Sequence, residues 1–468
     1  MRQIPSRARK QYFRPMAVLA IPIAGQSLVS FLVNLADNVM IGSLGDTAIS
    51  GVYMGTQMFT LLQWFVTGIT TSMTILMAQY WGRRDLDSIR KIASIGILFG
   101  LPVSVAFSLV SLCFPAGLIA LFTDVAGVVE AGTPYLRVLA LSFPFYCISQ
   151  LLVAAMRSIE NTRIGLYVSL VALGVNIGLN ALLIFGYLGF PALGAVGAAI
   201  ATLIARITEA GLLVCYLLFR EKTLVFRLRH LFQWDRRLTK LFFRYGTPVL
   251  LGEVVWGFNT MMRSYFMGRF DTQTITAFSM VNMLSQTVFI WILALEAAAG
   301  ILTGKLISSA GSEEIRTYTY HMQRIFLLTG AAAVAVLFLL RGPFLSLYSV
   351  SPEARAAAFT LSNVMIPIVF FSVYEDMTLC GIVKCGGETA FVLKVDAILV
   401  FLVMLPACLV GTRLGAPPSL IYLFLQIDQV IKCGVALVKV NRFHWAHDLT
   451  ETTSTLRRPP IPSQKRSD

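Results

Sequence analysis

One acidic residue lies inside a long apolar stretch near the start of the chain. The stretch covers residues 20–44 (AIPIAGQSLVSFLVNLADNVMIGSL) and carries Asp37 in its second half. About 20 apolar residues suffice to cross a bilayer as a helix, and a charge at membrane depth costs roughly 2.5–3.5 kcal/mol on insertion scales. We therefore expect Asp37 to face a polar cavity or a partner rather than lipid.

Three polar residues in later apolar runs could complete a site with this acid. Asn176 and Asn180 (VNIGLN) lie four residues apart and so share one helix face, and Thr202 lies in the run GAAIATLIAR. A carboxylate, two amide oxygens and a hydroxyl suit a hard cation such as Na⁺, or a carboxyl group that exchanges a proton. The alternative is that the asparagines only join helices by hydrogen bonds. We predict that these four residues form a cation-coupling site.

Ionisable residues also lie inside apolar runs of the second half. The seventh run carries Glu253, Trp256 and Arg263, and the tenth run carries Glu375 and Asp376. Arg263 is interpreted as the partner of a nearby acid, whereas no simple local pairing explains the three acids. Because ionisable residues at membrane depth are functional candidates by default, we predict that these five residues line a cleft for substrate or cation.

Simpler accounts exist for two other acids of the second half. Asp428 and Lys432 lie four residues apart, which allows a local ion pair on one helix. Asp396 follows Lys394 near a helix end and is interpreted as structural.

The composition indicates an integral membrane protein. Of the 468 residues, 56% are hydrophobic and 13% charged, and the mean hydropathy is +0.74, whereas soluble domains are about 25% charged. The 38 basic against 24 acidic residues could suggest nucleic-acid binding, but they gather in short gaps between apolar runs. The seven cysteines and four histidines form no zinc pattern. We therefore expect no nucleic-acid partner, no metal centre and no cofactor beyond a transported Na⁺ or H⁺.

About twelve apolar runs are each near the length of a membrane-spanning helix. They cover residues 16–40, 52–78, 92–113, 133–156, 164–187, 192–219, 243–268, 276–303, 322–340, 357–382, 391–411 and 418–440. Basic gaps such as residues 83–91 alternate with gaps such as 42–51 that hold no Lys or Arg. The positive-inside rule then places both termini in the cytoplasm.

The two halves of the sequence repeat at an offset of 226 residues, which pairs Pro22 with Pro248 and Gly42 with Gly268. An even number of spans in each half makes the repeat parallel, a design found in alternating-access carriers. We predict an all-α membrane protein with twelve transmembrane helices in two pseudo-symmetric six-helix bundles. The predicted segments are a cytoplasmic N-terminal segment 1–15, an N-lobe 16–219, a basic linker 220–242, a C-lobe 243–440 and a cytoplasmic tail 441–468, disordered after Trp445.

Several motifs in order resemble the multidrug and toxic compound extrusion (MATE) family. They are PIAGQ (22–26), ADNVMIGSLGDTAI (36–49), AQYWGRRD (78–85), AAMRSIENTR (154–163), the stretch 175–206 and CGGET (385–389). The resemblance implies a plasma-membrane exporter that works as a monomer among membrane lipids, releasing organic and often cationic compounds in antiport with Na⁺ or H⁺.

The resemblance also implies roles for individual residues. It assigns Asp37, Asn176, Asn180 and Thr202 to an N-lobe polar cluster, and Glu253 to a cation or substrate position of the C-lobe. Some members carry an acid where this chain has Asn180, so this cluster has one negative charge fewer.

Three other functions fit the sequence less well. A flippase for lipid-linked oligosaccharides or phospholipids would favour a cleft lined with Arg and Lys, but few cations lie inside the runs, mainly Arg206 and Arg263. A membrane enzyme would need a nucleophile or metal motif such as HExxH or GxSxG, and the sequence has neither. A two-lobed repeat with buried acids is not typical of a channel.

Overall fold

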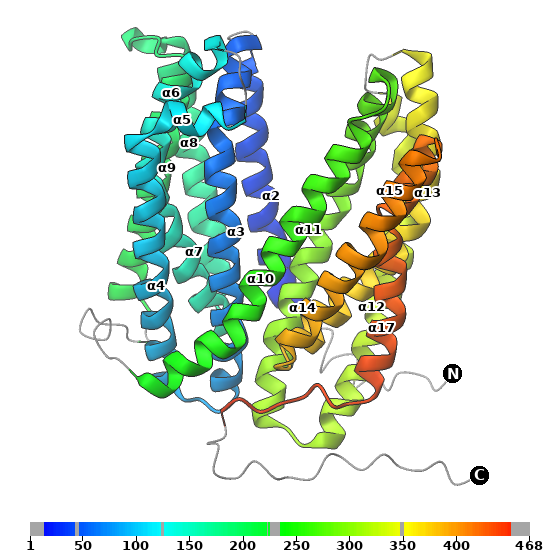
Figure 1. Ribbon diagram of the computed structural model, residues 1–468. Coiled ribbons are helices and arrows are strands. Elements are labelled where there is room, and N and C mark those ends of the chain that lie inside the picture. Colours follow the sequence, from blue (N-terminus) through cyan, green and yellow to red (C-terminus); the bar gives the residue numbers. More distant parts are fainter. Residues whose placement is uncertain are drawn as a thin grey trace. The chain divides into compact units, whose positions relative to one another are not determined.

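The chain forms a helical protein, shown in Figure 1. The computed structural model describes residues 14–42, 46–122, 126–221, 223–224, 235–346 and 351–450. The helices of the first half are α2 (Arg14–Gly42), α3 (Asp46–Gly82), α4 (Leu86–Cys113), α5 (Pro115–Ala120), α6 (Ala126–Ala140), α7 (Phe143–Ser158), α8 (Arg163–Phe185), the short 3₁₀ helix η2 (Tyr187–Gly189) and α9 (Ala195–Phe219). Those of the second half are α10 (Arg236–Met267), α11 (Thr272–Ser309), α12 (Ser312–Ser346), α13 (Pro352–Glu375), η4 (Asp376–Lys384), α14 (Thr389–Ile398), η5 (Leu399–Met404), α15 (Leu405–Arg413), α16 (Pro418–Phe424) and α17 (Ile427–Asn441).

The helices match the predicted spans. Within the described residues, ten stretches are long and apolar enough to cross a membrane, or eleven if the bent pair α6 and α7 is one span. The seventh predicted run forms α10, which is less apolar because it carries charges such as Arg244, Glu253 and Arg263. With α10 included, the helices correspond to the twelve predicted spans. The prediction of an all-α membrane protein is therefore confirmed.

The fourth predicted span is not straight. A bend of 48° separates α6 from α7, and Pro144 lies in the first turn of α7. Proline has no backbone N–H, so it fits the first turn of a helix but cannot continue the hydrogen bonding of a preceding one.

The described residues pack as two compact units. One contains the described residues of 21–77 and 84–246, and the other contains those of 14–20, 78–83 and 247–450. Helix starts follow the sequence repeat: α4 begins at Leu86 and α12 at Ser312, and α8 begins at Arg163 and α14 at Thr389, each 226 residues later. Residues 1–13 of the predicted N-terminal segment, residues 222 and 225–234 of the linker, and residues 451–468 of the tail lie outside the described residues.

The tenth and eleventh spans contain π-helical segments. The tenth span continues from α13 into η4, and the eleventh passes through η5 between α14 and α15. Wide turns of this kind often occur at functional sites. Lys384 is the last residue of η4, and its side chain is only 13% exposed.

The segment after α17 is folded as far as the structure describes it, which corrects the prediction of disorder directly after Trp445. We call residues 442–450 the C-terminal strap. Trp445 is fully buried and donates a hydrogen bond from Nε1 to the carbonyl oxygen of Val440 at 2.9 Å. Its ring covers Gly386, where an added Cβ would lie 2.4 Å from a ring carbon. Gln79 accepts a hydrogen bond from the backbone of Leu449 at 2.7 Å, so the strap also binds the last turn of α3.

Candidate functional site

The four predicted coupling residues of the first half form one hydrogen-bonded chain. Nδ2 of Asn180 donates to Oδ1 of Asp37 at 2.5 Å and to Oδ1 of Asn176 at 3.2 Å. Nδ2 of Asn176 in turn donates to Oγ1 of Thr202 at 3.4 Å. We call these four side chains, which come from α2, α8 and α9, the Asp37 cluster. Their proximity is observed, whereas their role in cation coupling stays a prediction.

Close packing of α8 on α9 holds three members of this cluster. The two helices lie along each other (Figure 1). An added Cβ on Gly197 would lie 2.4 Å from the carbonyl oxygen of Leu183, so the close approach requires a glycine. Asn176 and Asn180 are 1% and 0% exposed. Their spacing of four residues places both on the buried face of α8, as predicted.

One atom of the Asp37 cluster has no partner in the described part of the chain. Oδ1 of Asn180 is buried and accepts no hydrogen bond, and an unsatisfied buried acceptor costs about 1–3 kcal/mol. A cation bound by the cluster would give this oxygen a partner. The donor set of carboxylate, amide and hydroxyl oxygens fits a hard cation. Elsewhere, the described residues contain no group of three His, Cys, Asp or Glu side chains that could hold a metal ion.

A second polar pair lies one turn beyond Thr202 on α9. NH1 of Arg206 is 2.8 Å from Oε2 of Glu209, and the guanidinium group lies 5.0 Å from the ring centroid of Tyr146. Glu209 is buried and balances this charge. Glu209 was not singled out from the sequence, although its position three residues after an arginine inside an apolar run was an available signal.

A buried charge cluster occupies the second half. Nζ of Lys432 lies 2.9 Å from Oδ1 of Asp396, 3.3 Å from Oδ2 of Asp428 and 4.0 Å from Oε1 of Glu375. NH2 of Arg263 lies 3.8 Å from Oδ1 of Asp428. We call these five side chains, from α10, α13, α14 and α17, the Lys432 cluster. The interpretations of Arg263 as the partner of an acid and of Asp428 with Lys432 as an ion pair are confirmed.

The five predicted cleft residues do not gather at one point. Arg263 and Glu375 belong to the Lys432 cluster, and Asp376 follows Glu375 at the start of η4. Glu253 pairs instead with Lys384, whose Nζ lies 3.5 Å from Oε1. Trp256 is 59% exposed. Neither Glu253 nor Glu375 pairs with a neighbour in sequence; each lies within 4.0 Å of a lysine from a distant part of the chain, which the sequence did not predict.

Asn259 completes the polar network of α10 and was not singled out from the sequence. Its Nδ2 donates to Oδ2 of Asp428 at 3.4 Å, and its Oδ1 accepts from Nε of Arg263 at 3.3 Å. The signal available in the sequence was the spacing of Asn259 and Arg263, four residues apart on one helix face.

Known proteins resemble this chain over most of its length. It is 22% identical over 358 residues to the probable multidrug resistance protein YoeA of Bacillus subtilis, covering 76% of this chain and 77% of that protein. It is 22% identical over 414 residues to the probable multidrug resistance protein NorM of Thermotoga maritima, covering 88% of each.

Solved structures share the fold. A crystal structure of MATE in complex with MaL6 has a TM-score of 0.82 at 19% identity, covering 91% of this chain and 95% of that one. A MOP superfamily transporter from Pyrococcus furiosus has a TM-score of 0.81 at 18% identity, covering 91% and 94%.

The MatE family model matches residues 22–182 and 248–410. The two matched segments begin 226 residues apart, at the offset of the sequence repeat, and together they cover more than half of the chain. The chain therefore belongs to the MATE family, whose members are multi-pass membrane transporters and not enzymes.

Proposed function

We propose that this transporter exports organic, often cationic, compounds across the plasma membrane in antiport with Na⁺ or H⁺. It works by alternating access as a monomer surrounded by lipid, with a lobe formed by residues 16–219, a second lobe formed by residues 243–440 and both termini in the cytoplasm. The names of the relatives, probable multidrug resistance proteins, support this class of cargo. The alternation of basic gaps with gaps that hold no Lys or Arg supports the topology.

The observation that carries the proposal is the Asp37 cluster. It joins a carboxylate to two buried amides and a hydroxyl, and the buried Oδ1 of Asn180 has no hydrogen-bond partner among the described residues. Such a site can hold Na⁺, or it can take up a proton on Asp37. Because it has one carboxylate, a single monovalent cation neutralises it.

Coupling follows if the cation discriminates between conformations. A cation drives a cycle only by its difference in affinity for the two states. When the cation enters the Asp37 cluster from outside, it stabilises the state that releases cargo outward. After the cation leaves inward, the state that takes up cargo is favoured.

Reconstitution into liposomes tests the proposal and identifies the ion. Purified protein is placed in vesicles loaded with a fluorescent organic cation, and a Na⁺ gradient and a pH gradient are imposed separately. We expect efflux of the dye with one of the two gradients and none without a gradient. Absence of efflux under both gradients, with the protein folded and inserted, would reject cation antiport.

A flippase for a lipid-linked oligosaccharide or phospholipid is the second candidate. Its pyrophosphate or phosphate cargo would need uncompensated positive charge in the spans. Here Arg206, Lys384 and Lys432 each lie within 4.0 Å of a carboxylate oxygen, which favours drug antiport. Translocation of a labelled lipid-linked sugar in the same vesicles would favour the flippase.

A further inference from the structure

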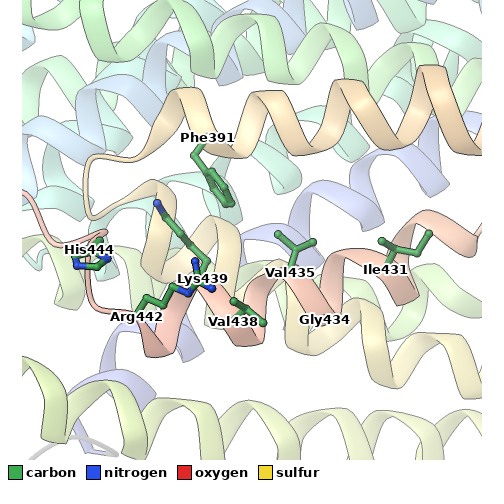
Figure 2. A pocket seen from close by; sticks show the side chains of 8 residues that line it. All are labelled: Phe391, Ile431, Gly434, Val435, Val438, Lys439, Arg442 and His444. Carbon is green, nitrogen blue, oxygen red and sulfur yellow. The ribbon is translucent and has the colours of Figure 1, made fainter. Parts of the chain in front are cut away.

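A groove with one basic end runs between α14 and α17 (Figure 2). It encloses about 560 Å³. Phe391 of α14 points toward α17, and Ile431, Val435 and Val438 of α17 complete the apolar part. None of the predicted site residues lines it.

The basic end of the groove carries more basic side chains than acidic partners. Lys439, Arg442 and His444 lie together at one end, and Ile431 lies at the other (Figure 2). Nζ of Lys439 is 3.4 Å from Oε1 of Glu388 and 4.3 Å from the ring centroid of Phe391. The side chains of Arg442 and His444 are exposed, and neither has an ion pair among the described residues. The end of the groove therefore offers donors to an anion.

The shape of the groove restricts the anion. A free phosphate would use Arg442 and His444 but would leave the apolar part empty. The apolar part lies along two helices that cross the membrane, and the basic end lies where α17 ends at Asn441. An amphiphile with an anionic head group matches both parts, and basic pockets between membrane helices are known to bind such lipids.

We propose that this groove is a binding site for an anionic phospholipid. An acyl chain lies along Phe391, Val435 and Val438, and the phosphate group accepts hydrogen bonds from Arg442 and His444. The site is separate from the Asp37 cluster and the Lys432 cluster.

Gly434 provides a test that leaves the charges unchanged. It lines the groove, and an added Cβ would meet no atom within 4 Å. A Cβ therefore has room at this position, and Gly434→Leu is expected to place an apolar side chain in the groove. Arg442→Gln combined with His444→Gln removes the two exposed basic side chains and leaves Lys439 and the apolar part intact.

The experiment measures lipid retention by native mass spectrometry of the full-length protein in detergent. The probes are phosphatidylglycerol, phosphatidylcholine with the same acyl chains, and inorganic phosphate. We expect the wild type to retain phosphatidylglycerol at least tenfold better than phosphatidylcholine. The double variant should lose this preference, and Gly434→Leu should lose retention of phosphatidylglycerol.

The matched control is Arg237→Gln combined with Lys240→Gln, two exposed cations on α10, which should retain the wild-type preference. Equal retention of both lipids by the wild type would overturn the proposal, and so would unchanged binding in both groove variants. Competition by millimolar inorganic phosphate as strong as by the lipid would also overturn it, in favour of a simple anion site. A melting curve of each variant separates lost binding from lost folding.

Discussion

Replacing Asp37 by asparagine should abolish coupling and leave the fold intact. Asparagine has nearly the same shape, and its side-chain oxygen can still accept the hydrogen bond that Asn180 donates at 2.5 Å. What is lost is one negative charge. A unit charge about 4 Å from a cation contributes about 4 kcal/mol at an effective dielectric constant of 20. Because 1.4 kcal/mol is a factor of ten, cation affinity should fall on the order of a thousandfold.

The assay compares initial rates of gradient-driven dye efflux for the wild type and Asp37→Asn at equal protein per vesicle. The driving cation is titrated, so that a loss of affinity appears as a shift of the half-saturating concentration or as loss of efflux. Glu314→Gln, which removes an exposed acid from the first turn of α12, is the matched control and should behave like the wild type. Wild-type rates with an unshifted cation dependence in Asp37→Asn would refute the reasoning. A large fall in its melting temperature would instead assign Asp37 a structural role.

Three further predictions concern the second half. Lys432→Met leaves buried carboxylates without their shared cation and should lower the free energy of unfolding by about 3–5 kcal/mol; thermal melts should show partial recovery when Asp428→Asn is added. Trp445→Ala removes a fully buried ring at a cost of about 3–5 kcal/mol and should release the C-terminal strap, which amide hydrogen exchange over residues 443–450 would detect. Burial raises the pKa of Glu388. The hydrogen bond with His447 and the nearby charge of Lys439 lower it by more, so that the pKa of Glu388 lies below its usual value. The ionised Glu388 therefore contributes stability above the usual carboxyl pKa, and this stability is lost as the pH falls through the lowered pKa. As the pH is lowered, the melting temperature of Glu388→Gln should fall less steeply than that of the wild type.

Local patterns in the sequence predicted the spans and the Asp37 cluster. A run of apolar residues must form a helix of nearly fixed length, because the bilayer has a fixed thickness and satisfies no backbone hydrogen bonds. Asn176 and Asn180 share a face because of the helix period alone. A carboxylate at membrane depth needs polar partners, and few polar side chains lie inside the apolar runs of the same half.

The pairing of charges in the second half could not be predicted in the same way. Glu253 and Lys384 are 131 residues apart, and Lys432 meets acids from two other helices. Which lysine reaches which acid depends on how the helices are rotated against each other, and the wide turns of η4 displace the residues that follow. The periodicity of residues within one helix predicts neither the rotation of the helices nor this displacement.

The sequence alone determined the class of protein, the number of spans, the repeat and the four residues of the Asp37 cluster, because each depends on local length, spacing or composition. Tertiary structure alone decided the counter-ions of Glu253 and Glu375, the burial of Trp445 and the groove between α14 and α17. Each of these depends on contacts between segments far apart in the chain, and the free energy of such contacts is defined only once the helices have packed.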